Sequence, residues 1–243
     1  MIMKYIVTES QYNLIQEQLE REIVKLPRRP VWTWEQVQDY LDEIGNPYYI
    51  VRNNLSLTYV ELPSTGKLIE VSGNMSAKNS EIMTLANLQK VGGSLKLSFN
   101  NIRYLGNLQF VGKNLFLRET RITTTNKLEY VGGGLDLFRS EIRHLAELKE
   151  VGGDLHLGYT PLKSLGELKK VGGFLICEAC PLISLDKLEF VGDYVNLTGS
   201  KIESLGNLKF VGGNLNLQQT PISEKYTEEE IRSMVEVKGN VLL

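Results

Sequence analysis

The sequence predicts a β-solenoid, a rod of stacked coils that are each twenty residues long. Valine recurs every twenty residues from Val51 to Val211, without insertion or deletion. A leucine column repeats at the same spacing from Leu68 to Leu208, and a third column holds leucine or isoleucine from Leu62 to Ile222. Apolar columns in one register are typical of stacked repeats, which bury their apolar faces against each other. We therefore expect a right-handed stack of about nine coils with one parallel β-sheet.

A single coil shows where the strand should lie. In the coil ELKEVGGDLHLGYTPLKSLG, Leu155 and Leu157 alternate with polar neighbours, which is the period of a strand with one buried face. A strand this short must pair with the same strand of the next coil. Parallel stacking at about 4.8 Å per coil predicts a rod roughly 40 Å long. Outside the strand, Leu148, Val151, Leu162 and Leu165 of this coil are expected to point into the core.

A glycine-rich column precedes each strand. It holds Gly, Asn or Asp at every position but one: Asn53, Gly73, Gly93, Lys113, Gly133, Gly153, Gly173, Asp193 and Gly213. These residue types tolerate positive φ, so the column predicts a tight left-handed turn. Lys113 is then expected to be mildly strained.

The coil resembles a leucine-rich repeat. The pattern Leu155-x-Leu157-x-x-Thr160-x-Leu162 is similar to L-x-L-x-x-N-x-L, in which the polar position hydrogen-bonds backbone between coils. The V-G-G turn with its S-L-G-x-L return looks more like short repeats encoded by large tailed phages and environmental bacteria than like those of bacterial effectors. The resemblance covers Pro47 to Tyr226. The small polar position is filled by Ser80, Asn100, Thr120, Ser140, Thr160, Cys180, Ser200 and Thr220.

The two ends of the chain are predicted to cap the solenoid. Residues 1–46 form a helical cap, residues 47–226 the repeats, and residues 227–243 a C-terminal cap with a partial repeat beginning at Val237. The apolar spacing predicts one helix over Thr8 to Lys25, and Thr33-Trp34-Glu35-Gln36 begins a second as a capping box. Capping covers exposed core and strand edges. Alternatively, the basic turn Lys25 to Arg29, with Trp32 and Trp34, docks a partner.

The composition excludes several classes of function. A net charge of −2 lacks the basic excess that nucleic-acid or membrane-surface binding needs. No apolar run approaches the roughly 18 residues of a membrane span, and the apolar start Met1 to Val7 is short for a signal peptide. Two cysteines can form only one disulfide bond, too few to stabilise a secreted fold of this size, which favours a reducing compartment. We expect a cytoplasmic protein without a cofactor.

Cys177 and Cys180 form a C-x-x-C motif that needs its own explanation. In the coil register, Cys177 falls in the buried column of Leu157, and Cys180 falls in the small polar column of Thr160. A zinc site would need a second pair of ligands, and a redox pair is typical of a helix N-terminus. The motif is therefore interpreted as structural, with no metal bound.

Two histidines offer limited acid–base chemistry. His144 is expected on the solvated return side of its coil. His156 faces outward beside Asp136, with Asp154 nearby, so a weak hydrolase on the Asp136, Asp154 and His156 face is one hypothesis. No nucleophile shares that face in clear geometry, so a charged binding face is the preferred interpretation.

The outward strand positions vary between coils, and their variation predicts a binding face. The first and last coils carry small polar residues there, whereas the central coils carry aromatic and charged ones. Exposed aromatic side chains beside arginine are typical of interaction hot spots. The predicted partner-binding residues are Phe99, Phe116, Arg118, Asp136, Phe138, Arg139, Asp154, His156, Tyr159, Phe174, Ile176, Glu178 and Tyr194.

These patterns predict a non-enzymatic scaffold that binds a protein partner through the concave sheet, as a monomer or weak homodimer. The phage resemblance implies a phage-encoded protein acting on a host factor, for example a defence component. The alternative is a structural or virion-associated protein that self-assembles through the same face. An aromatic column at Phe110, Tyr130, Phe190 and Phe210 is interpreted as edge packing.

Overall fold

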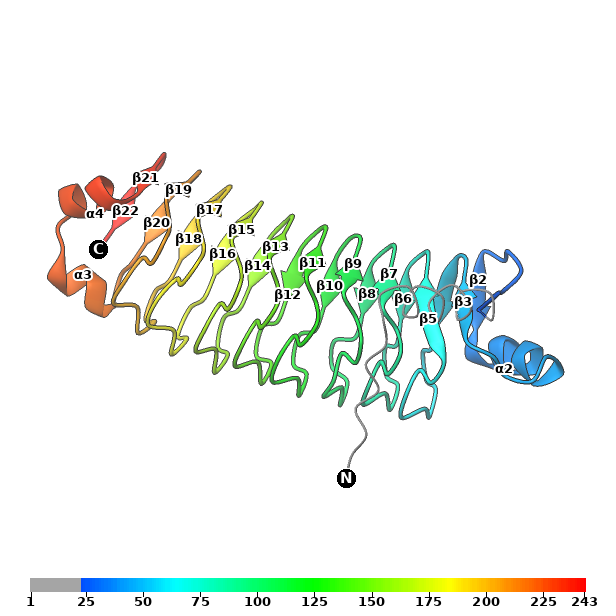
Figure 1. The fold of residues 1–243 in the computed structure, drawn as a ribbon. Helices are drawn as coiled ribbons and strands as arrows, with labels where there is room; N and C mark the ends of the chain where they lie inside the picture. Colours follow the sequence, from blue (N-terminus) through cyan, green and yellow to red (C-terminus); the bar gives the residue numbers. More distant parts are fainter. Residues whose placement is uncertain (1–22) are drawn as a thin grey trace, which may run out of the picture.

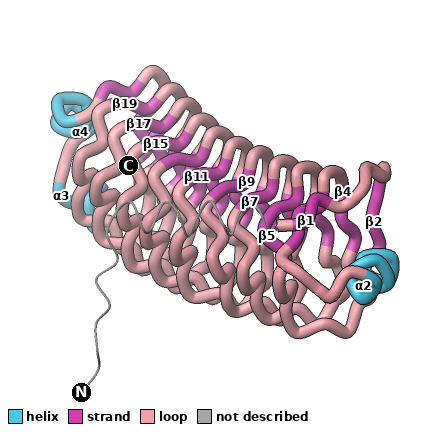
Figure 2. Tube along the Cα trace, turned by 45° about the vertical axis from the view of Figure 1, so that its right-hand side comes forward, coloured by secondary structure: helices cyan, strands magenta, loops and turns pink. Residues whose placement is uncertain are grey.

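The computed structural model describes residues 23–243, which form a β-solenoid of about nine turns with about twenty residues per turn (Figure 1). The solenoid predicted from the valine register is confirmed. It differs in one respect, because each coil contributes two short strands and the described residues form two parallel sheets of eleven strands, where a single sheet was expected. Figure 2 shows the strands along one side of the rod and irregular loops along the other.

Sheet A contains the strands that end on the valine column. Within the repeats these strands pair in parallel with the equivalent strand twenty residues away, as Val131 does with Val111 and Val151. Its members are β1 (Val24–Lys25), β3 (Tyr49–Val51), β5 (Leu68–Val71), β7 (Lys90–Val91), β9 (Phe110–Val111), β11 (Tyr130–Val131), β13 (Glu150–Val151), β15 (Lys170–Val171), β17 (Phe190–Val191), β19 (Phe210–Val211) and β21 (Glu236–Val237).

Sheet B contains the strands that the leucine alternation predicted. Leu135 pairs with Leu115 and Leu155 in the same twenty-residue register. Its members are β2 (Val31–Thr33), β4 (Asn54–Ser56), β6 (Met75–Ser76), β8 (Leu95–Lys96), β10 (Leu115–Phe116), β12 (Leu135–Asp136), β14 (Leu155–His156), β16 (Leu175–Ile176), β18 (Val195–Asn196), β20 (Leu215–Asn216) and β22 (Val241–Leu242). The valine, leucine and isoleucine columns meet between the sheets in one buried core.

The glycines between the two sheets serve close stacking, which corrects the predicted left-handed turn. None of the residues in that column has positive φ, so Lys113 carries no left-handed strain. The preceding column needs glycine for a different reason: a Cβ on Gly172 would lie 2.1 Å from the carbonyl oxygen of Gly152 in the previous coil. Left-handed residues occur elsewhere, among them Phe99, Glu119 and Arg139 in the turn after sheet B.

The small polar column lies under that turn. The hydroxyl of Thr120 donates to the Leu117 carbonyl at 2.7 Å, and Thr160 donates to Leu157 at 2.7 Å, so these bonds stay within one coil. Only the bonds from Asn100 and Cys180 reach a carbonyl of the previous coil. The expected bonding between coils is therefore the exception.

Helices and extra strands close both ends of the solenoid (Figure 1). The second predicted helix is confirmed as α2 (Trp34–Glu43), with the capping box between Thr33 and Gln36 present. At the other end lie α3 (Pro221–Lys225) and α4 (Glu228–Met234), and α4 begins at the expected capping box on Thr227. The first predicted helix, Thr8 to Lys25, lies largely outside the described residues, and its last two residues, Val24 and Lys25, form strand β1 where helix was expected. No helix in residues 23–243 is long and apolar enough to cross a membrane.

The solenoid begins earlier in the chain than the sequence predicted. Strands β1 and β2 extend sheets A and B ahead of Pro47, so part of the expected helical cap is itself a coil. Trp32 is buried in the core beneath the guanidinium of Arg29, 4.5 Å from its ring centroid. A buried indole is not available to a partner, so the docking alternative for Trp32 is wrong.

Candidate functional site

The outer face of sheet B holds the predicted binding residues. Some occupy the outward strand positions, such as Phe116 and Asp136, and others the turn that follows each strand, as at Arg118 and Phe138. Asp154, Phe174 and Tyr194 lie directly before a strand. Most are half-buried by their neighbours, whereas the side chains of Phe99 and Tyr159 remain more than half exposed. The structure therefore places all of the predicted residues on one side of the rod, although they form separate contact groups.

The central contact group surrounds the ring of Phe138. The guanidinium carbon of Arg118 lies 4.5 Å from the Phe138 ring centroid, and that of Arg139 lies 5.1 Å away. The ring of His156 tilts against Phe138 at 4.9 Å, and the ring of Tyr159 meets it edge-on at 5.7 Å. Aromatic pairs and cation–π contacts of this kind fix side chains that would otherwise move freely in water. Residues from three successive coils thus form one ordered surface, here called the Phe138 cluster.

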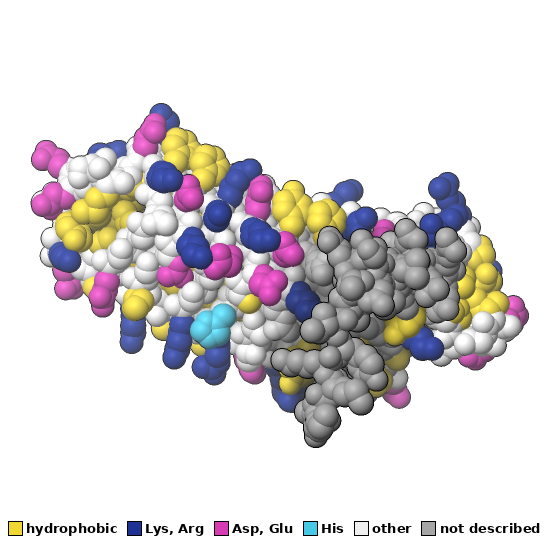
Figure 3. Space-filling view, in the orientation of Figure 1, with side chains coloured by type: hydrophobic (Ala, Val, Ile, Leu, Met, Phe, Trp, Pro, Cys, Tyr) yellow, Lys and Arg dark blue, Asp and Glu magenta, His cyan; other side chains and the backbone are white. Residues whose placement is uncertain are grey.

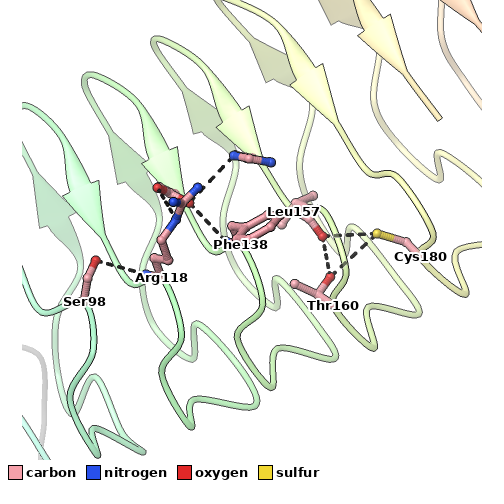
Figure 4. Close-up of polar contacts among 8 residues, drawn as sticks. Ser98, Arg118, Phe138, Leu157, Thr160 and Cys180 are labelled. Carbon is pink, nitrogen blue, oxygen red and sulfur yellow. Dashed lines mark hydrogen bonds and ion pairs between the residues drawn. The ribbon is translucent and has the colours of Figure 1, made fainter. Parts of the chain in front are cut away.

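An acidic residue holds the cluster from one side. Asp136 Oδ2 lies 3.4 Å from the Nε atom of Arg118, and its Oδ1 accepts a hydrogen bond from the Phe138 backbone N–H at 3.0 Å. Figure 4 shows Arg118 and Phe138 projecting from neighbouring coils, with the backbone N–H of Arg118 bonded to the Ser98 hydroxyl. The Asp136 carboxylate therefore positions both the cation and the ring that it stacks on.

His156 has little of the environment that a general base requires. Its Nδ1 atom lies 3.9 Å from Asp136 Oδ1, beyond hydrogen-bond distance. Burial lowers the pKa of His156, Asp136 opposes this effect, and the nearby Arg118 adds to it. Among the described residues, no hydroxyl or thiol hydrogen-bonds the imidazole. The lowered pKa favours the neutral imidazole, so His156 adds an uncharged ring to the cluster.

Asp154, the third member of the hydrolase hypothesis, has a structural contact. Its Oδ1 accepts a hydrogen bond from the Phe174 backbone N–H in the next coil at 3.2 Å. Asn54, Asn74 and Asn114 occupy the same column and accept equivalent bonds from the following coil. Asn54 and Asn74 belong to the small polar residues of the first coils, to which the sequence analysis gave no role, yet these asparagines link successive coils. Their recurrence every twenty residues was the signal that could have identified this role.

A second contact group lies towards the C-terminal end of the face. The rings of Phe174 and Tyr194 stack at 5.1 Å with 19° between their planes. Beside them, Asn196 Nδ2 donates to Glu178 Oε1 at 2.5 Å, a contact that sequence reasoning missed. Ile176 follows His156 in the same outward column. Phe99 stands apart from both groups, exposed in a left-handed turn.

The opposite sheet offers a contrasting surface. Ion pairs link neighbouring coils, including Lys149 to Glu129 and Lys209 to Glu189, and stacked rings occupy the same face at Phe190 and Phe210. Figure 3 shows lysine or arginine alternating with aspartate or glutamate across one face of the rod. The aromatic edge packing expected at Phe110 and Tyr130 is present, with rings 5.3 Å apart. The charged groups of this surface are thus paired with each other, and its rings are stacked on each other, between neighbouring coils.

The C-x-x-C motif has the structural position that the coil register predicted. Cys177 and Cys180 are both buried and both reduced. Burial raises the pKa of the Cys177 thiol well above its ordinary value, and Cys180 donates to the Leu157 carbonyl (Figure 4). Within residues 23–243, no three His, Cys, Asp or Glu side chains gather as a metal site.

The geometry therefore defines a β-solenoid with an ordered aromatic and arginine-bearing surface on one of its two sheets. Comparisons of the chain with protein-family models, with curated proteins and with solved structures find no match. The function has to be inferred from the surface itself.

Proposed function

We propose that this chain is a non-enzymatic protein-interaction scaffold and that its binding surface is the outer face of sheet B. The observation that carries the proposal is the Phe138 cluster, in which two guanidinium groups and two further rings contact one phenylalanine. Arginine and aromatic residues provide most of the binding energy in protein interfaces. Because their mutual contacts already order them, little conformational entropy remains to be lost on binding.

The surroundings of the cluster support the same function. Hot spots are surrounded by residues that contribute little energy but exclude water. On this face the flanking coils carry Ser76 and Ser98 before the cluster and Asn216 and Gln218 after it. A surface with an apolar centre and a polar rim has the anatomy of an interface.

Two finer parts of the proposal depend on the sequence patterns. The leucine spacing and the small polar column support membership of the leucine-rich-repeat class. The resemblance to phage-encoded repeats supports a host protein as the partner, met in the cytoplasm.

The test compares two triple variants. The first changes Phe116, Phe138 and Tyr159 to alanine on sheet B, and the control changes Phe110, Tyr130 and Phe190 to alanine on sheet A. Proteins captured by the wild-type chain from its native cells are identified, and the purified candidate is titrated against each variant. We expect the sheet B variant to lose binding by about a hundredfold or more, because hot-spot truncations cost upwards of 2 kcal/mol each. Equal loss in both variants, or none in either, would overturn the proposal.

A further inference from the structure

The outer face of sheet B is electrically polarised along the rod. Lys78, Lys96 and Arg139 lie in its N-terminal half, and none of them forms an ion pair with another described residue. Asp154 and Glu178 lie in its C-terminal half and also lack cationic partners among those residues. Glu119 is an exposed acidic residue in the N-terminal half, where it is outnumbered by the three cations. A face that is positive at one end and negative at the other is complementary to a reversed copy of itself.

We propose that the partner of this face is a second copy of the chain, packed antiparallel about a twofold axis. The axis runs along the strand direction between β12 and β14. This inference rests on the proposed function, since it uses the same surface, and it names a second copy as the occupant of that surface in place of a host protein. In a twofold interface, each contact between two different positions occurs twice. The arrangement places β10 of one copy opposite β16 of the other, and β12 opposite β14.

The outward strand residues match under this operation. Phe116 on β10 faces Ile176 on β16 of the second copy, which pairs two apolar side chains at both ends of the contact. Asp136 on β12 faces His156 on β14. The aromatic and aliphatic side chains that are half-exposed in a single chain would then be covered.

The turn positions match as well. Arg118 faces Glu178, and the guanidinium keeps donors beyond the Nε that faces Asp136, so it can bind a second carboxylate. Arg139 faces Tyr159, a cation opposite an aromatic ring. Phe99, 60% exposed, faces Gly199, where a Cβ would have no neighbour within 4 Å. An exposed ring thus meets open space on the opposing copy.

The parallel arrangement lacks this complementarity. A twofold axis along the rod keeps each coil opposite the same coil of the other copy, so an axis over the column that holds Arg118 and Glu178 would place Arg118 opposite Arg118 and Glu178 opposite Glu178. Like charges placed opposite each other are unfavourable by several kcal/mol. The charge pattern therefore selects the antiparallel arrangement.

The opposing residues stay within reach of each other when the two sheets are rotated by the angle usual for packed sheets. Arg118 and Glu178 lie about 7 Å from the axis at roughly 4.8 Å per coil. Sheets pack about 30° apart, which displaces the two side chains by about 4 Å, a distance within the reach of arginine. Phe99 and Gly199 are five coil spacings apart, about 24 Å, so the interface is near the lower size limit for stable complexes. We expect a dissociation constant in the micromolar range.

The test is a charge swap read by sedimentation equilibrium of the full chain, from about 1 µM to about 500 µM. Arg118→Glu and Glu178→Arg should each weaken self-association by about tenfold or more, because each places like charges opposite each other twice. Mixing the two single variants, or combining both changes in one chain, should restore association. Arg143→Glu, an exposed charge reversal on the loop side, is the control and should leave association unchanged.

The possible outcomes separate this inference from the proposed function. A wild-type chain that stays monomeric throughout overturns the second copy as partner, and so does association that neither single variant weakens. The proposed function fails separately, if the triple alanine variant on sheet B still binds a captured protein. Rescue in the mixture would identify the Arg118–Glu178 contact directly.

Discussion

Arg118 stacks on the ring of Phe138 in the next coil while its Nε atom faces Asp136 at 3.4 Å. The guanidinium therefore joins an ion pair and a cation–π contact at a single point on the surface. Because the Asp136 carboxylate also accepts the Phe138 backbone N–H, all three residues hold each other in place. This relationship explains how an outward-facing phenylalanine is ordered without being buried.

Phe138→Leu should destabilise the chain by about 1 kcal/mol beyond the loss expected from buried area, because it removes two cation–π contacts and two ring contacts. Urea unfolding of the variant measures this cost. Phe116→Leu is the control, since Phe116 has no stacking partner among the described residues. Equal costs at the two positions would show that the ring contacts of Phe138 contribute no stability.

Stability should fall in mild acid because of His156. Its pKa is lowered in the folded chain, first by burial and then by Arg118, while Asp136 and Glu178 oppose the shift. The folded state therefore favours the neutral imidazole, and this contribution is complete above the unfolded pKa of about 6.5 and is lost as the pH falls through the folded pKa. Unfolding free energies at pH 8 and pH 5 should differ more for the wild type than for His156→Gln. A larger difference in the variant would contradict the assignment.

Two glycine substitutions should separate close stacking from backbone conformation. Gly172→Ala places a Cβ 2.1 Å from the Gly152 carbonyl oxygen, so the stack must open, and we expect a loss of at least about 3 kcal/mol. Gly199→Ala has open space but a φ of +67°, and should cost about 1 kcal/mol. Thermal unfolding of both variants provides the comparison, and a reversed order would refute the stacking explanation.

The two thiols should be inert in the folded chain. Burial raises the pKa of Cys177, so this thiol forms little thiolate. The hydrogen bond with Cys177 lowers the pKa of Cys180, so the inertness expected of Cys180 rests on its burial alone. A thiol-reactive dye at pH 8 should label the native protein very slowly and label both cysteines once urea unfolds it. Rapid labelling of the native chain would indicate a reactive pair and would revive the redox interpretation.

The sequence predicted the coils because their residues are fixed by contacts with identical residues. Val131 packs between Val111 and Val151, so the valine column had to recur every twenty residues. The second sheet escaped prediction because most of its strands hold a single buried residue, the valine, and the outward position before it varies, as at Glu150, Lys170 and Phe190. A single buried residue shows no alternation, whereas Leu155 and Leu157 of the other sheet do.

The twenty-residue spacing also predicted which candidate site residues share a face, since Phe116, Asp136 and His156 occupy equivalent positions in successive coils. It could not predict their contacts. Whether Arg118 turns towards Phe138, or Asp154 towards a backbone N–H, depends on rotamers that the register does not fix. The left-handed turns were hidden as well, because Phe99, Glu119 and Arg139 are residue types that rarely adopt positive φ.

The most direct test of the central claim is site-specific photo-cross-linking in cells that make the protein. A photoreactive phenylalanine analogue replaces Phe138 or Tyr159 on the outer face of sheet B, and Tyr104 or Tyr130 elsewhere on the rod. We predict strong cross-links from positions 138 and 159, to a second copy or another protein, and weak ones from 104 and 130. Cross-links that are as strong from Tyr104 and Tyr130, or absent from positions 138 and 159, would contradict it.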